Sequence, residues 1–206
     1  MKLLLVNFTK NYQFATRIKL NNTNIQQVNQ VKILGTIISE DFSWNANCEN
    51  IIKKCNMRMQ LLQTVASFGA NERDLKHIYI QFIRTILEGS CQVWYSGLTK
   101  KNISDLERCQ KSAVKIISQN YTTYKKTLKS LNMDTLKSRY EMLTLRFATN
   151  AITHDKLKHF FPLNKKTHHM KTRKTEVFQK IHTLTERYEK SPIVHMQKIL
   201  NEKIIK

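Results

Sequence analysis

The sequence has very little glycine and proline, with 4 Gly and 2 Pro among 206 residues. These two residues together make up about 12% of an average protein. Such a shortage of turn-forming residues disfavours a many-stranded sandwich or barrel and favours long helices. No apolar run approaches the roughly 18 residues of a membrane-spanning helix, and the run Leu3–Val6 is too short for a signal peptide. A hydrophobic content of 41% excludes a wholly disordered chain.

Acidic residues are also scarce, with 15 Asp and Glu against 35 Lys and Arg, which gives a formal net charge of +20. Because like charges repel, this excess does not help folding, but it suits a polyanionic partner. We therefore expect a nucleic-acid partner and no membrane. The sequence identifies no small-molecule substrate and leaves the oligomeric state open.

The cysteines number four, too few for a disulfide framework in a chain of this size. We expect a reducing compartment and so an intracellular protein, without distinction between nucleus and cytoplasm. Cys48 and Cys55 are seven residues apart on one helical face, and Cys91 and Cys109 have apolar neighbours. Because tetrahedral zinc sites use closer pairs, a core role is favoured over metal ligation.

Residues for catalysis are not evident, and we predict no catalytic and no metal-binding residue. The acids are scattered, and the adjacent pair Glu40–Asp41 is interpreted as a charge at a helix entry. No glycine-rich phosphate-binding loop is present. The pair His168–His169 lies in a basic stretch and is interpreted as solvated. No Ser or Cys has an obvious neighbouring base, although a triad can assemble from distant residues.

The predicted fold is mainly α, a helical bundle with a small N-terminal antiparallel β hairpin or sheet. Three short runs, Lys2–Phe8, Gln13–Leu20 and Val31–Ile38, predict two or three strands. Gly35 inside the last run indicates a bulge or a close backbone approach. We divide the chain into a β-rich segment at 1–42, a helical domain at 43–165 and a basic, helical or partly disordered tail at 166–206.

Helical periodicity begins near Ser43 and predicts a first long helix that ends near Gly69. Asn71 is the predicted N-cap of the next helix. That helix has a predicted inner face of Leu75, Ile78, Tyr79, Phe82, Ile83 and Ile86. Further helices are predicted at Lys101–Ile117, Tyr124–Leu131 and Thr135–Ala151, with a short helix or turn at Val93–Tyr95. The Thr135–Ala151 helix is expected to be buried through Leu136, Tyr140, Leu143, Phe147 and Ala151. Weaker patterns follow at Val177–Tyr188 and Ile193–Ile205, after a basic linker or arm at Lys165–Lys174.

The basic residues are better organised than the acids. Arg108, Lys111 and Lys115 recur at intervals of three and four residues, opposite the apolar positions of their predicted helix. This pattern suits a helix laid along a phosphate backbone, where Lys and Arg give affinity without base specificity. Any single Lys fits an ordinary solvated face, but the whole set favours nucleic-acid contact. The candidate binding residues are Lys53, Lys54, Lys100, Lys101, Arg108, Lys111, Lys115, Lys125, Lys126 and Lys129.

Four ordered blocks of residues carry a resemblance to a known family. They are Val31–Gly35 followed by Phe42–Trp44, then Ile86–Ser90 with Val93–Trp94, then Leu106–Ile117, and finally Leu136–Phe147 with Phe160–Pro162. Over about residues 1–165 the chain resembles the region after the catalytic centre in reverse transcriptases of non-LTR (LINE-type, Jockey-like) retrotransposons. The matching motif residues, for which we expect structural roles, are Lys32, Leu34, Gly35, Trp44, Glu88, Trp94, Glu107 and Gln110.

The resemblance implies that residues 1–42 are the end of the palm with its primer grip. Residues 43–165 would then be a helical thumb that holds the template–primer duplex, so the partner that the resemblance implies is an RNA–DNA hybrid or RNA. The family polymerises DNA on RNA with two metal ions held by palm aspartates, in a turn that would lie upstream of Met1. This sequence contains no Asp-Asp. We expect a non-catalytic remnant that needs no cofactor of its own, because magnesium would belong to the missing palm. A co-opted helical protein or RNA interaction module and a non-functional, pseudogene-like product are the alternatives.

Overall fold

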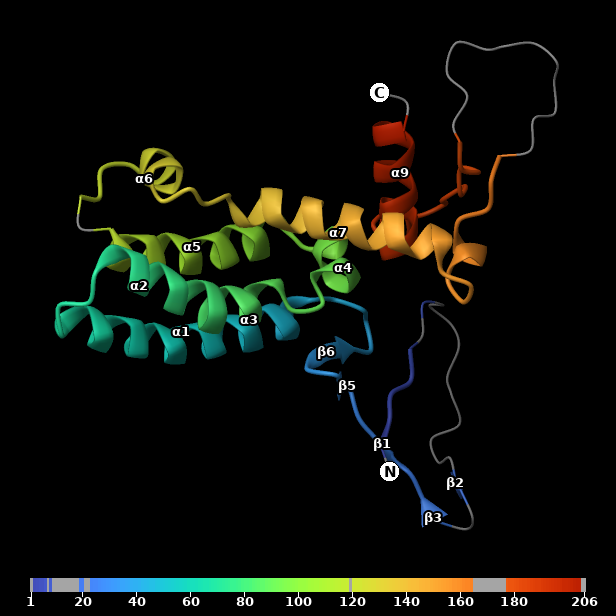
Figure 1. Ribbon diagram of the computed structural model, residues 1–206. Coiled ribbons are helices and arrows are strands. Elements are labelled where there is room, and N and C mark those ends of the chain that lie inside the picture. Colours follow the sequence, from blue (N-terminus) through green and yellow to red (C-terminus); the bar gives the residue numbers. More distant parts are fainter. Residues whose placement is uncertain are drawn as a thin grey trace.

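The computed structural model describes residues 2–6, 8, 19–20, 23–118, 120–164 and 177–204. It confirms a mainly α chain with a small β part near the N-terminus. Figure 1 shows that several helices lie side by side as a bundle, while the first strands extend away from it. The predicted basic arm at Lys165–Lys174 lies entirely outside the described residues.

Within the described residues, the strands form three short pairs. β1 (Lys2–Leu3) pairs in parallel with β4 (Gln26–Gln27). The antiparallel pairs are β2 (Lys19–Leu20) with β3 (Thr23–Asn24), and β5 (Gln30–Ile33) with β6 (Thr36–Ser39). Most of the predicted strand Gln13–Leu20 lies outside the described residues.

The predicted strand Val31–Ile38 is in fact two strands joined by a tight turn. Leu34 and Gly35 connect β5 to β6, and their φ angles are 48° and 90°. A two-residue hairpin loop with positive φ at both positions matches the right-handed twist of its strands. Gly35 is therefore a turn residue, and the predicted bulge or close backbone approach is wrong, because no atom lies within 4 Å of a Cβ placed there. The apolar residues on both sides of the turn conceal it in the sequence.

The helices begin after a short turn. Asp41 Oδ1 accepts a hydrogen bond from the Ser43 amide at 2.9 Å, and this bond lowers the pKa of that carboxyl.

The first helices are α1 (Asn45–Ser67), α2 (Glu72–Ile78), the π-helix η1 (Tyr79–Arg84), α3 (Thr85–Glu88), α4 (Cys91–Trp94) and the 3-10 helix η2 (Tyr95–Gly97). They are followed by α5 (Lys100–Ile117), α6 (Tyr124–Ser130), α7 (Leu136–Thr153), the 3-10 helix η3 (Lys158–Phe160), α8 (Glu186–Glu189) and α9 (Pro192–Ile204).

Local capping signals set several helix starts, and the predicted N-cap Asn71 is confirmed. The side chain of Asn71 accepts from the Asp74 amide at 2.9 Å, which satisfies one of the free N–H groups at the start of α2. Thr99 caps α5 and Thr135 caps α7 in the same way, through the amides of Asn102 and Ser138. These contacts form within four residues of sequence and need no tertiary packing.

The buried face of the second helix differs from the prediction because a π-helical segment interrupts it. Leu75, Tyr79, Ile83 and Leu87 are buried at intervals of four residues. Hydrogen bonds from i to i+5 widen each turn, so inward positions recur more slowly than in an α-helix. Phe82, predicted to be buried, is 47% exposed, and Ile78 and Ile86 are only half-buried.

The prediction for α7 is also partly wrong. Leu136, Tyr140 and Ala151 are buried, but Phe147 is exposed and Leu143 is half-buried. The small residues of α7 face α9 instead. A second apolar cluster forms there from Ala148, Ala151, Phe161, Phe178, Met196 and Leu200.

The C-terminal prediction holds for one of its two helices. α9 matches the predicted Ile193–Ile205 pattern, whereas Val177–Tyr188 is helical only in α8, after an extended stretch. Within that stretch Phe178 pairs with Leu163 in a β-bridge. Within the described residues, no helix is long and apolar enough to cross a membrane.

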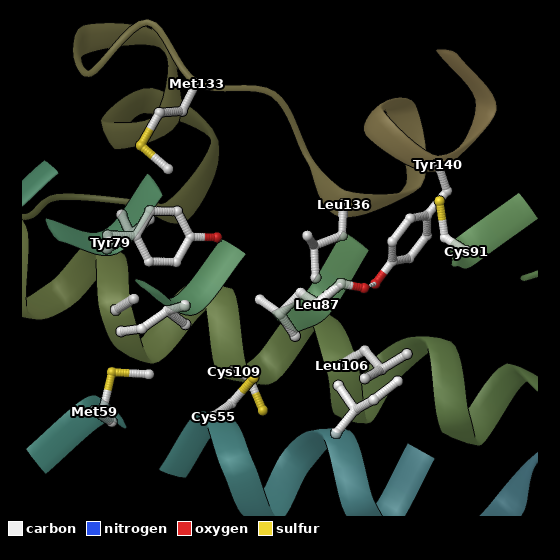
Figure 2. Packing of buried hydrophobic residues seen from close by; sticks show 14 of the residues in the cluster. Cys55, Met59, Tyr79, Leu87, Cys91, Leu106, Cys109, Met133, Leu136 and Tyr140 are labelled. Carbon is white, nitrogen blue, oxygen red and sulfur yellow. Dashed lines mark hydrogen bonds between the residues drawn. The ribbon is translucent and has the colours of Figure 1, made fainter. Parts of the chain in front are cut away.

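The main core lies between α1, α2–α3, α5 and α7, and it contains all four cysteines as free thiols. The predicted core role of the four cysteines is confirmed. Figure 2 shows Cys55 on α1 and Cys109 on α5 directed toward one another across the helix interface. Burial raises the pKa of Cys48, Cys55 and Cys91 to about 12.

Slow alkylation of these cysteines is the expected consequence. At pH 8, a pKa of about 12 instead of 9.0 lowers the thiolate fraction about 10³-fold. The folded state binds these protons more tightly than the unfolded state. The slower alkylation of the folded chain is therefore fully present below pH 9, and it is lost as the pH rises through the folded-state pKa of about 12. Iodoacetamide labelling followed by mass spectrometry should show far slower reaction in the native chain than in guanidinium. Equal rates in both states would contradict this core.

Candidate nucleic-acid interface

The helix α5 is packed on one side and free on the other. Leu106, Cys109, Ala113 and Ile117 are buried against the core. α5 packs against α1, α2, α6 and α7, so four elements fix its orientation. The opposite side is left to solvent along the whole length of the helix.

Five cations occupy this solvent side. At about 100° per residue, they fall within an arc of roughly 100°. All are exposed, and Ser104 is the other residue within the arc. We call this set the basic stripe; its members are Lys100, Lys101, Arg108, Lys111 and Lys115.

The basic stripe is almost uncompensated. Arg108 pairs with Asp105 at 3.3 Å, but its side chain is 74% exposed, so water screens the pair. Lys115 Nζ lies 5.6 Å from the centroid of the Tyr121 ring. Within the part of the chain that the structure describes, the four lysines form no ion pair. The stripe therefore presents free positive charge on a rigid helix.

The other five candidates lie on different elements. Lys125, Lys126 and Lys129 are exposed on α6, which packs on α5. Lys53 points outward on α1. Lys54, also on α1, lies beside Ile86 of α3. The structure thus gathers five of the ten candidates on one face and places three on a neighbouring helix.

Two motif residues hold α5 in place through a buried polar network. Gln110 is fully buried; its Oε1 accepts from the Tyr79 hydroxyl at 2.7 Å, and its Nε2 donates to Tyr124 Oη at 3.0 Å and to the Asp134 carbonyl at 2.8 Å. Glu107 accepts from the Tyr124 hydroxyl and from the Leu136 amide at 3.1 Å, the first amide of α7. Burial, with the bond to Glu107, raises the pKa of Tyr124 well above its usual range. The network ties η1, α5, α6 and α7 together.

Three further motif residues also make internal contacts. Glu88 binds the Arg139 guanidinium through two bonds of 2.7 and 2.9 Å, and Arg84 approaches the same carboxylate at 3.5 Å. Trp94 is buried and donates to the Gly89 carbonyl at 3.0 Å. Trp44 is buried directly against Gly97, where an added Cβ would lie 2.6 Å from the indole nitrogen. The fold has no room for a larger residue at Gly97.

The remaining motif residues belong to the β5–β6 hairpin. Lys32 is exposed on β5, and Leu34 at the turn is 98% exposed beside Gly35. Sequence reasoning missed the tyrosines Tyr79 and Tyr124 as network members, because the bonds join residues 14 to 31 positions apart. No local pattern marks such bonds.

Among the described residues, no group of three or more His, Cys, Asp or Glu side chains could hold a metal ion. The comparisons with protein-family models, with curated proteins and with solved structures yield no match to this chain. The basic stripe is therefore interpreted from its own geometry and charge.

Proposed function

We propose that the chain is a nucleic-acid-binding, non-catalytic remnant of an RNA-directed DNA polymerase from a non-LTR retrotransposon. In this proposal the basic stripe of α5 holds a template–primer duplex. The observation that carries it is the stripe itself, five exposed cations on one packed helix with Asp105 as their single ion-pair partner in the described chain.

The dimensions of the stripe suit a duplex. From Lys101 to Lys115, α5 extends about 20 Å at 1.5 Å per residue. A duplex of that length carries on the order of ten phosphates over its two strands, at one charge per 1.7 Å. Several cations can therefore reach phosphates at once without distortion of the helix. The contacts would give affinity without base specificity.

The resemblance to non-LTR reverse transcriptases supports the choice of a duplex, because it identifies residues 43–165 with the thumb. It also supports the absence of polymerase activity, because that family relies on adjacent aspartates and the sequence contains no Asp-Asp. The alternative, an interaction module without a role in reverse transcription, shares the binding surface but not the preference for a hybrid.

Salt-sensitive binding of an RNA–DNA hybrid is the expected result. With about six phosphate contacts, the affinity should fall on the order of 10³-fold between 50 and 200 mM salt. Fluorescence anisotropy of a labelled hybrid of roughly 20 base pairs, about two turns long, measures it. A flat salt response would contradict the electrostatic interface. Metal-dependent nucleotide incorporation on a primed RNA template would contradict the non-catalytic part of the proposal.

A further inference from the structure

A depression of about 430 Å³ lies between α1 and α3, and none of its lining residues belongs to the basic stripe. It is lined by Lys54, Met57 and Arg58 of α1 and by Ile86 of α3. Figure 1 shows α1 and the α2–α3 segment side by side and running in opposite directions, and α1 contacts both η1 and α3. The depression therefore belongs to the seam between two antiparallel helices.

Exposed apolar residues also lie one turn along each helix from the residues that line the depression. On α1, Met57 is 65% exposed and Leu61, four residues later, is 44% exposed. On the α2–α3 segment, which runs in the opposite direction, Phe82 is exposed and precedes the half-buried Ile86 by four residues, so it is expected at the same end of the seam as Leu61. The π-helical turn of η1 rotates Phe82 out of the core. We call the seam with these four residues and its two cations, Lys54 and Arg58, the α1–α3 groove.

The rim of the groove is positively charged. Lys54 and Arg58 are one turn apart on α1, and neither forms an ion pair with a carboxylate of the described residues. A basic partner would be repelled here, whereas carboxylates beside an apolar face would meet both cations. Met57 can adapt its unbranched side chain to different apolar surfaces.

The shape and charge of the groove identify one class of occupant. Two antiparallel helices with apolar residues at four-residue intervals form a seam into which a third helix packs. A nucleic-acid backbone would pair with the cations but leave Met57, Leu61 and Phe82 uncovered. We infer that the α1–α3 groove binds an acidic amphipathic helix of a partner protein, with apolar residues on its buried face and Asp or Glu on its flanks.

A displayed peptide library tests this inference with the full chain as target. The probe is a library of helical peptides of about 15 residues, roughly four turns, with Leu, Ile, Phe or Met on one face. The flanking positions are randomised between Glu and Lys, so that sequencing of the selected clones reports the charge preference. We expect enrichment of clones with Glu at the flanks over clones with Lys.

Two matched variants locate the binding. Met57→Glu places a carboxylate in the groove, whereas Met142→Glu changes another exposed Met, on α7, outside it. The selected peptides should bind Met57→Glu at least about tenfold more weakly than wild type, and Met142→Glu as tightly as wild type. Circular dichroism should show the same helicity in all three proteins.

Three results would overturn the inference: no enrichment of any clone, enrichment of Lys-flanked clones, or equal binding to wild type and Met57→Glu. The outcome is independent of the basic stripe. A stripe variant that no longer binds hybrid should still bind the selected peptides, so failure of one proposal is distinguishable from failure of the other.

Discussion

Reversal of three charges in the basic stripe should weaken binding of an RNA–DNA hybrid by about 10²-fold or more at moderate salt. The variant is Arg108→Glu/Lys111→Glu/Lys115→Glu. Each substitution removes a phosphate contact and adds a repulsive carboxylate on the same helix face. The salt dependence of the remaining affinity should also become less steep, because fewer counterions are released. Anisotropy titrations at several salt concentrations measure both effects.

A charge-matched control separates the stripe from net charge. Lys137→Glu/Arg146→Glu/Lys203→Glu changes the net charge by the same amount at exposed positions of α7 and α9. This control should lose far less affinity than the stripe variant. All six substituted residues are exposed, so both variants should keep the helicity of the wild type. Equal loss of affinity in the two variants would contradict a localised interface.

Gln110→Leu should lower the free energy of unfolding by about 3 kcal/mol, because the buried Tyr79 hydroxyl and the part-buried Asp134 carbonyl lose their partner, while Tyr124 keeps only its bond to Glu107. Leucine matches the volume of glutamine but offers no hydrogen bond. The Tyr79 hydroxyl loses its acceptor and the Asp134 carbonyl loses its donor. Urea denaturation followed by circular dichroism measures the loss.

A double variant tests whether the lost hydrogen bonds cause this effect. Tyr79→Phe removes the hydroxyl that Gln110→Leu leaves without a partner. The double variant should therefore lose less free energy of unfolding than the sum of the losses in the two single variants. Strict additivity, or a loss below about 1 kcal/mol for Gln110→Leu alone, would show that the network does not hold α5 in place.

The parts of the fold that follow from local signals could be predicted from the sequence. Asn71 caps α2 through a residue three positions away, and the apolar spacing of α5 gives its length and its outward face. The turn at Leu34–Gly35 was harder to predict, because apolar residues continue on both sides of it. The π-helix η1 gave no local signal, and its wider turns exposed Phe82.

The two candidate sites also differ in how far local sequence patterns predict them. The basic stripe lies on one helix, so its residues could be grouped from spacing alone. The place of Lys54 beside α3, and not in the stripe, could not be predicted. It depends on which side of α1 packs against α3. The α1–α3 groove joins residues about 30 positions apart and depends on the register shift of η1. Long-range packing, not local propensity, creates it.

Lysine footprinting tests the central claim, duplex binding by α5, most directly. The full chain is acetylated briefly with and without excess RNA–DNA hybrid, and mass spectrometry gives the modification of each lysine. We expect Lys101, Lys111 and Lys115 to be protected by the hybrid, while the exposed Lys180 and Lys203 react as in the free protein. Protection spread evenly over all lysines, or confined to residues outside α5 and α6, would contradict the account.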